Sequence, residues 1–126
     1  MKKIILIICL INLFIKPVNA DMTVPTVEDI MILVRNKTTS SDKLKEYMFN
    51  YAKISGILDY ALTDASRIVP QDKYKHSHEC IAKPVEVWFE IIFDDYKIGR
   101  IPVSTPFTLA ASIDIYKRCI EPFKSN

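Results

Sequence analysis

A long seam of apolar residues with helical spacing constrains the fold of this chain more than any other feature. Its members recur at alternating steps of three and four: Leu44, Tyr47, Tyr51, Ile54, Leu58, Ala61 and Ala65. A half-buried strand would instead place apolar residues at every second position. The seam predicts a helix from about Asp42 to Ser66 that buries one face. Within it, Gly56 is expected to permit the close approach of another backbone.

Shorter apolar patterns of helical period lie on both sides of this seam. They predict further helices with the approximate bounds Val27 to Asn36, Pro84 to Lys97 and Pro106 to Cys119. Thr26 and Asp29 form a capping box at the first of these helices, and Thr105 is placed to cap the last. Gly99 can end the helix between them. Because the chain has only two glycines, a turn-dense β-sandwich is disfavoured, and we expect a small all-α bundle of about four helices.

The last two predicted helices carry apolar stripes that indicate their buried faces. The helix after Pro84 has one stripe of Val85, Trp88 and Ile92 and a second stripe of Phe89, Phe93 and Tyr96. The final helix has a stripe of Leu109, Ile113, Tyr116 and Ile120. The wide apolar arc after Pro84 leaves two interpretations open, a central helix or an oligomer or partner surface. Its acidic residues Glu86, Glu90 and Asp94 form either a solvated face or a contact for a basic partner.

The first 20 residues have the pattern of a cleavable secretory signal. Lys2 and Lys3 precede an apolar run from Ile4 to Ile15, and small residues lead up to Ala20. The run is shorter than the roughly 20 residues that a transmembrane helix needs, although an uncleaved anchor is the alternative. We therefore predict a signal peptide over residues 1–20 and a single helical domain over residues 21–126. This domain would be exported and free of the membrane after cleavage.

Removal of the signal changes the charge of the chain. Three of the 17 basic residues lie within the signal, whereas all 15 acidic residues follow it. The formal net charge therefore falls from +2 to about −1. A weakly acidic protein lacks the electrostatic attraction that nucleic acids and anionic membranes require, so neither is an expected partner.

Two cysteines, Cys80 and Cys119, remain after the signal, which contains Cys9. An even pair in an exported chain predicts a disulfide, with two free thiols as the alternative. The bridge would close a loop of about 40 residues, and the chain-entropy treatment gives roughly 4 kcal/mol of stabilisation for that length. It would tie the start of the helix after Pro84 to the end of the final helix if those two helices form an antiparallel pair.

The stretch from Ile68 to Lys83 is the most irregular part of the sequence, and we expect an exposed loop there. His76, His78 and Cys80 could ligate zinc or copper, but their spacing matches no standard site and the disulfide removes the thiolate. The chain has no Gly-x-Ser-x-Gly nucleophile motif. We therefore expect no catalytic residue, no metal and no cofactor, with a minor enzyme that uses one of the two histidines as a remote alternative.

Three parts of the sequence together resemble a known family. An early short helix reads Thr26-Val27-Glu28-Asp29-Ile30-Met31, and a long helix carries aromatic residues around Gly56 between Tyr47 and Tyr60. The third part is a cysteine shortly before a proline and a helix, then a proline in the connector, then a helix with small residues that ends in a cysteine. In this sequence these features are Cys80 to Pro84, Ile101-Pro102, Ala110-Ala111 and Cys119. This layout resembles the Rap/Tai family of immunity proteins, which protect bacteria against peptidoglycan amidase effectors of type VI secretion.

The resemblance implies an all-helical periplasmic protein without enzymatic activity that is commonly a homodimer. It would bind an amidase delivered by neighbouring cells and block the active-site cleft. Under this interpretation the segment Gln71 to Glu79 is a candidate plug, with a set of partner-binding residues that consists of Tyr74, His76, His78 and Glu79. The alternative function is a small acid-stress chaperone of the HdeA-like kind, in which the stripe that contains Phe89 would be a masked client site.

Overall fold

The computed structural model describes residues 24–36 and 40–125, and within these ranges the chain is all-α as predicted. The elements in chain order are α2 (Val27–Arg35), α3 (Ser41–Ile68), α4 (Gln71–Ile81), α5 (Val85–Lys97), α6 (Phe107–Cys119) and the 3₁₀ helix η1 (Glu121–Phe123). The predicted signal peptide, residues 1–20, lies outside the described residues. None of the described helices is both long enough and apolar enough to span a membrane.

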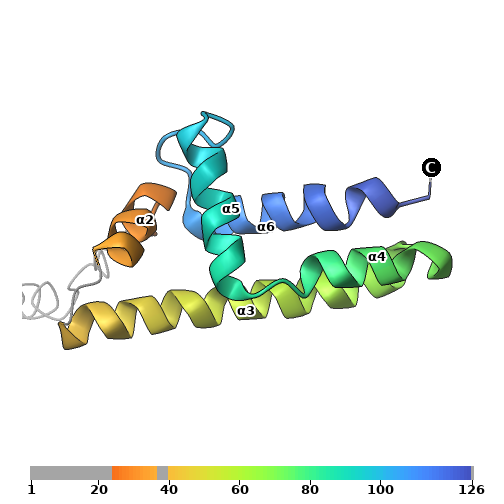
Figure 1. Cartoon of the computed structure of the whole chain (residues 1–126), viewed down its shortest axis with the longest axis horizontal. Coiled ribbons are helices and arrows are strands. Elements are labelled where there is room, and N and C mark those ends of the chain that lie inside the picture. Colours follow the sequence, from red (N-terminus) through yellow and green to blue (C-terminus); the bar gives the residue numbers. More distant parts are fainter. Residues whose placement is uncertain (1–23, 37–39, 126) are drawn as a thin grey trace, which may run out of the picture.

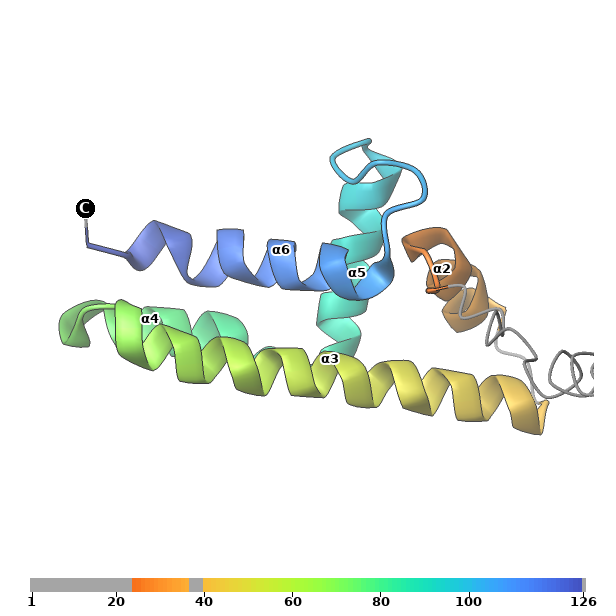
Figure 2. The same ribbon diagram turned by 180° about the vertical axis from the view of Figure 1, so that it is seen from behind.

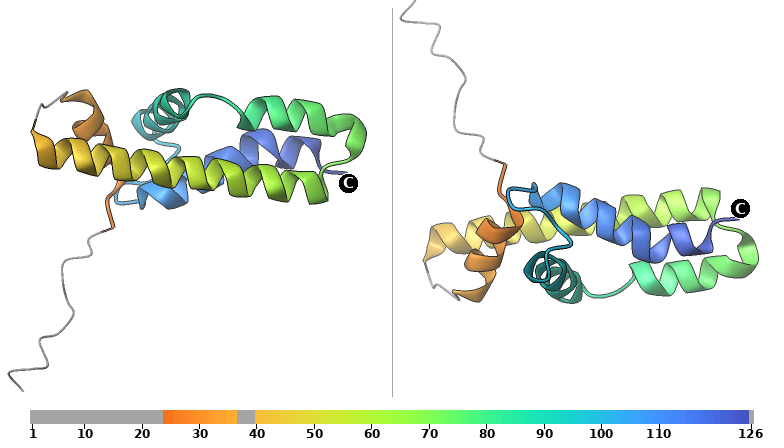
Figure 3. Two further views of the ribbon diagram at one scale, coloured as in Figure 1. Left: turned by 90° about the horizontal axis from the view of Figure 1, so that it is seen from below. Right: turned by 90° about the horizontal axis from the view of Figure 1, so that it is seen from above.

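Helix α3 is the longest element, and its 28 residues extend for about 42 Å at 1.5 Å per residue. Helix α2 lies near its N-terminal end, α5 crosses near its middle, and α4 folds back along its C-terminal part (Figure 1, Figure 3). Helix α6 lies over the same C-terminal part and completes a bundle with α3 and α4. The predicted seam faces these neighbours from Tyr47 onward, with Ile54, Ala61 and Ala65 buried. Its first member, Leu44, is 58% exposed, so the seam begins one turn later than predicted.

Helix α5 stands across α3 and α6, so the expected antiparallel pairing of α5 with α6 is wrong (Figure 1, Figure 2). Its side chains nevertheless form the centre of the core, because Trp88 and Phe93 are fully buried and Phe89 is 1% exposed. The ring of Phe89 stacks on those of Phe107 and Tyr47, with centroids 5.5 and 5.9 Å away. The wide apolar arc of α5 is therefore explained by a central position in the bundle.

A proline occupies the N-cap position of three of the five described α-helices. Pro70, Pro84 and Pro106 occupy the N-cap positions of α4, α5 and α6, each with φ between −53° and −56°. The pyrrolidine ring fixes this φ and so sets the direction in which each helix begins. The predicted cap of α6 is therefore wrong by one residue. The Thr105 hydroxyl instead donates to Pro102 O at 2.7 Å.

Two other predicted helix boundaries are confirmed. Asp29 N donates to Thr26 Oγ1 at 3.2 Å, and Thr26 N donates to Asp29 Oδ2 at 2.9 Å, which completes the capping box. Gly99 follows the end of α5 with φ 76°, a left-handed conformation that glycine adopts without strain.

The apolar stripe predicted for α6 is wrong in its first half. Leu109 and Ile113 are 51% and 41% exposed, whereas the buried face consists of Phe107, Ala110, Ala111, Ile115 and Cys119. The sequence of α6 offers two apolar arcs, and the arc with small residues packs inward. Alanine permits a closer approach of α3 and α5 than leucine would.

We expect Phe89→Ala to lower the free energy of unfolding by about 3–5 kcal/mol, because it removes the ring around which the core aromatics stack. Phe49, which is 62% exposed on α3, provides the matched control. Phe49→Ala should change stability by less than about 0.5 kcal/mol. Urea unfolding followed by circular dichroism measures both values, and equal losses would contradict the assignment of the core.

Candidate partner-binding surfaces

The segment predicted as an exposed loop is helix α4, so that prediction is wrong. Gln71–Ile81 forms a regular helix that begins directly after Pro70. Its inward face consists of half-buried Tyr74 with buried Ser77 and Ile81, at steps of three and four. The sequence gives only a weak helical signal here, because a serine and a tyrosine occupy positions where helices commonly have leucine or isoleucine.

The four predicted partner-binding residues therefore project from a helix in different directions. The rings of Tyr74 and His78 lie on one side, with centroids 6.0 Å apart. His76 stacks on Phe123 at 6.1 Å. Glu79 is exposed, and its carboxylate lies 3.9 Å from the ammonium group of the lysine one turn before it. The structure thus brings Tyr74 together with His78 and places the other two elsewhere on the helix surface.

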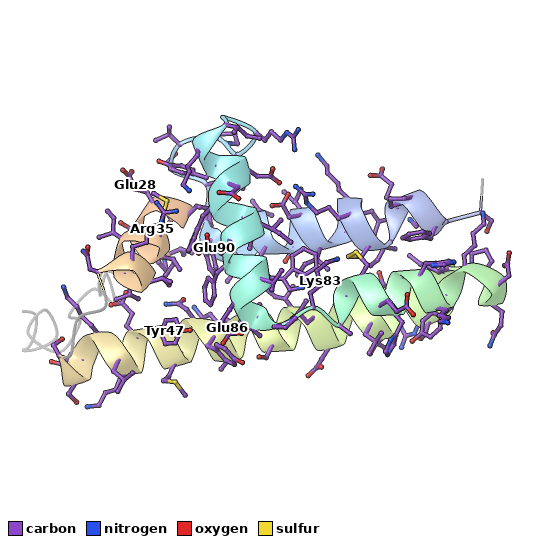
Figure 4. The ribbon with its side chains drawn as sticks, viewed as in Figure 1. Glu28, Arg35, Tyr47, Lys83, Glu86 and Glu90 are labelled. Atoms are coloured by element: carbon purple, nitrogen blue, oxygen red, sulfur yellow. A yellow bond between two sulfur atoms is a disulfide. The ribbon has the colours of Figure 1, made fainter. Side chains whose placement is uncertain are left out.

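Helix α4 is fastened to α6 by a covalent bond and a buried hydrogen bond. Cys80 and Cys119 form the predicted disulfide with Cα atoms 5.3 Å apart, although the bridge starts from α4 and not from α5. Buried Ser77 donates from Oγ to Cys119 O. After the helix, Lys83 Nζ lies 3.3 Å from Cys80 O and 5.6 Å from the centre of the Trp88 ring (Figure 4). The exposed residues of α4 consequently have a fixed position relative to the core.

A second candidate surface was not predicted from the sequence. The connection between α5 and α6, residues 98–106, projects beyond the end of α5 (Figure 1, Figure 2). Val103 within it is 74% exposed and precedes Ser104, whose φ of 69° is uncommon for a residue with a side chain. Ile98 at the base is 62% exposed, whereas Ile101 is buried. The loop therefore presents apolar atoms to solvent while one isoleucine anchors it in the core.

Backbone hydrogen bonds hold both ends of this α5–α6 loop. The amides of Arg100 and Ile101 donate to Asp95 O at 2.9 and 3.3 Å. At the other end, Val27 N donates to Thr105 O at 3.2 Å. The start of α2 thus lies against the end of the loop, and the loop conformation is set within the chain.

A cluster of charged side chains lies at the base of the loop. Asp95 is 4% exposed, and its Oδ1 accepts from Arg100 Nη1 at 3.2 Å while its Oδ2 accepts from Arg118 Nη2 at 2.6 Å. Burial acts to raise the pKa of Asp95. The hydrogen bond and charge of Arg118, with the hydrogen bond of Arg100, overcome this effect and lower the pKa below its usual value.

Asp114 on α6 has the opposite shift. It is 8% exposed, and its Oδ2 has no hydrogen-bond partner among the residues that the structure describes. Burial and, second, the charge of Asp95 raise the pKa of Asp114 to about 6. Both carboxyl groups line a cavity of about 530 Å³ whose walls also include Ile101, Ile113 and Lys117.

A third surface lies between α3 and α6. A shallow hollow of about 590 Å³ is lined by Lys53, Gly56, Ile57, Tyr60, Thr108, Leu109 and Ser112. A neighbouring hollow of about 420 Å³ extends to Asp64. Tyr60 is 74% exposed, and no atom lies within 4 Å of the position that a Cβ would take at Gly56. The expected approach of another backbone to Gly56 is therefore not made within the described part of the chain.

Three of the acidic residues of α5, Glu86, Glu90 and Asp94, are exposed, whereas Asp95 is buried. Figure 4 shows Glu86 and Glu90 along the exposed side of the helix. Burial and then the charge of Glu86 raise the pKa of Tyr47. Asp94 pairs with Lys97 at 3.2 Å, and both side chains are well exposed, so this pair contributes little to stability.

Among the described residues, no three or more histidine, cysteine or carboxylate side chains are grouped so that they could hold a metal ion. No protein-family model, curated protein or solved structure matches the chain.

Loss of the disulfide should lower the free energy of unfolding. For Cys80→Ser with Cys119→Ser, we expect a decrease of about 4 kcal/mol, because the unfolded chain regains the entropy of a loop that spans 39 residues. Chemical denaturation of the double variant and the natural protein measures this difference. A decrease below about 1 kcal/mol would show that noncovalent packing alone holds α4 in place.

Proposed function

We propose that this protein is a periplasmic immunity protein that binds a peptidoglycan amidase delivered by type VI secretion and occludes its active site. The class of target comes from the resemblance to the Rap/Tai family. The observation that carries the proposal is the projecting α5–α6 loop, which combines exposed apolar side chains with ends fixed by hydrogen bonds. Such a shape suits an enzyme cleft, which is concave and mostly apolar.

A fixed loop is an effective inhibitor because little conformational freedom is lost when it binds. Ordering a side chain at an interface costs about 0.5–1.5 kcal/mol, and preorganisation removes part of this cost. Val103 supplies an exposed apolar group. The side chain of Arg100, which is 67% exposed although it pairs with Asp95, supplies a positive charge in the same loop.

Helix α4 supplies a second proposed contact surface, with Tyr74, His76, His78 and Glu79 as its residues. The disulfide and Ser77 hold this helix in place. Because α4 and the α5–α6 loop lie on different parts of the bundle (Figure 1), substitutions can test the two surfaces separately.

The proposed location is the periplasm, reached by export and removal of residues 1–20. The Cys80–Cys119 disulfide supports this part of the proposal, because such bonds form and persist in oxidising compartments and are rare in the cytosol.

The alternative function, an acid-stress chaperone, is favoured by a different observation. Phe89 and Phe93 form a fully covered aromatic cluster, and Asp95 on the same helix is held by two arginines. Protonation of Asp95 at low pH would remove these ion pairs and loosen α5. Protection of unfolded clients at pH 2–3 would support this function over inhibition.

The arrangement of charged and apolar residues on one face of α3 supports the proposed homodimer. Lys53, Ile57, Tyr60 and Asp64 share one helix face, at steps of four, three and four. If two α3 helices pair antiparallel about a point midway between Ile57 and Tyr60, Lys53 of each copy meets Asp64 of the other. Tyr60 of one copy then lies near the open space above Gly56 of the second. A two-fold interface requires this kind of self-complementary surface.

The pairing predicts that single charge reversals weaken the dimer and that the double exchange restores it. Lys53→Asp or Asp64→Lys should shift the protein toward monomer in sedimentation analysis, because each places like charges opposite one another. The combined variant should return to dimer. Exchanging Lys75 and Glu79 on α4 is the matched control and should have no effect. A natural protein that is monomeric at all concentrations would contradict this interface.

The target is tested by immobilising residues 21–126 with the disulfide formed and passing a lysate of the source strain over it. We expect capture of a cell-wall amidase whose digestion of peptidoglycan stops in the presence of the immobilised protein. A captured protein without such activity, or an amidase that remains active, would contradict the proposal.

Substitutions then identify the contact surface. Val103→Asp should weaken binding to the captured amidase by on the order of 10- to 100-fold, because it places a charge in a desolvated contact. Val87→Asp on α5, at a valine that is 40% exposed, is the control and should bind normally. Tyr74→Ala with His76→Ala should also weaken binding, and unchanged affinity would remove α4 from the interface.

A further inference from the structure

Two buried carboxyl groups lie next to each other where α5, α6 and the α5–α6 loop meet. Asp95 has one arginine on each carboxylate oxygen, so its charge is well compensated. Within residues 24–36 and 40–125, Asp114 has no such partner for Oδ2, although this atom is shielded from solvent. An ionised carboxylate in this position would be buried, unpaired and beside a second negative charge. A protonated carboxyl group would instead donate a hydrogen bond to Asp95.

We propose that Asp95 and Asp114 form a proton-binding site in which one shared proton fastens the base of the α5–α6 loop. The proton resides on Asp114 and is donated in a hydrogen bond to the Asp95 carboxylate, which keeps its bonds to Arg100 and Arg118. Release of the proton to solvent leaves two carboxylates that repel each other across the contact between α5 and α6.

The charged groups around Asp114 act on its protonation in opposite directions. Asp95 on α5 favours the protonated form, whereas Arg118 and Lys117 on α6 favour the ionised form. Arg100 in the loop is occupied by Asp95. The titratable groups that α3 presents to α6, Tyr60 and Asp64, line a neighbouring hollow that shares Ile113 and Lys117 with the cavity at Asp114 but does not include Asp114 itself. On α2, Glu28 lies beside Tyr96, and α4 contacts α6 through Ser77 and the disulfide.

The direction of the pH dependence follows from the two shifts. The pKa of Asp114 is raised, so its stabilising proton is fully bound below the unfolded value of 3.8 and is lost as the pH rises through about 6. The pKa of Asp95 is lowered, so its contribution is present above the unfolded value and disappears as the pH falls through the folded value. The base of the loop is therefore most firmly held between about pH 4 and pH 6.

Through this site, the conformation of the α5–α6 loop depends on pH. Arg100 and Ile101 donate their amides to the backbone of Asp95, so any displacement of Asp95 moves the start of the loop. Its effect on inhibition rests on the proposed function, whereas proton binding by the pair does not. Under mildly acidic conditions the loop would be held in one conformation, and at neutral pH it would open more often.

Two measurements on the mature protein without any partner test the proposal. The carboxyl ¹³C signals of its aspartates, titrated by NMR, should include one that titrates near pH 6. The amides of Arg100 and Ile101, corrected for intrinsic exchange rates, should be protected on the order of 10-fold or more better at pH 5 than at pH 7.5. The absence of an aspartate that titrates above pH 5, or equal protection at both pH values, would overturn the proposal.

The variant Asp114→Asn keeps the hydrogen bond to Asp95 but removes the titration of residue 114. The amide has the shape of the protonated acid and can donate to Asp95 at every pH. This variant should abolish the difference in amide protection between pH 5 and pH 7.5. Asp94→Asn is the matched control, since Asp94 is adjacent to Asp95 but exposed, and it should keep the difference. If the first variant fails to fold, the titration of the natural protein still decides the matter. If one aspartate titrates near pH 6 as expected but the protein inhibits no amidase, the result would contradict the proposed function and leave the proton-binding site standing.

Discussion

The stacking of Phe89 between Tyr47 and Phe107 determines how the other elements are arranged. The three rings come from α5, α3 and α6, so one aromatic cluster fixes the positions of three helices. Because α5 contributes two apolar stripes, it can be buried only by lying across the bundle with neighbours on more than one side. This transverse position carries the end of α5 away from α3, and the loop that follows therefore projects from the bundle.

The same position makes a buried charge unavoidable. Asp95 continues the buried stripe of α5 one turn beyond Ile92, and a carboxylate at such a site must be paired. Arg100 from the loop and Arg118 from α6 supply the two cations. The burial of α5 thus leads to a polar contact that also anchors the loop, and the core and the candidate site share one set of interactions.

Much of the fold could be predicted from sequence because its signals are local. The seam of α3, the capping box at Thr26 and the turn at Gly99 each depend on a few neighbouring residues. Helix α4 cannot be predicted in this way, because Ser77 occupies a buried position and gives no apolar signal. The loop and the Asp95–Asp114 pair depend on residues that meet only after α5 has crossed α6. An acidic residue in phase with an apolar stripe, as Asp95 is, was the one sequence signal of that site.

Helix α4 and the α5–α6 loop are held in place by different chemistry, and this difference has consequences for binding. The position of α4 depends on a covalent bond to α6 and on the hydrogen bond from Ser77. The α5–α6 loop depends on ion pairs and backbone hydrogen bonds around Asp95. Reduction would therefore act first on α4, whereas a change of pH would act first on the loop. A partner that contacts both surfaces would lose affinity under either change, and a partner that contacts the loop alone would respond mainly to acidity.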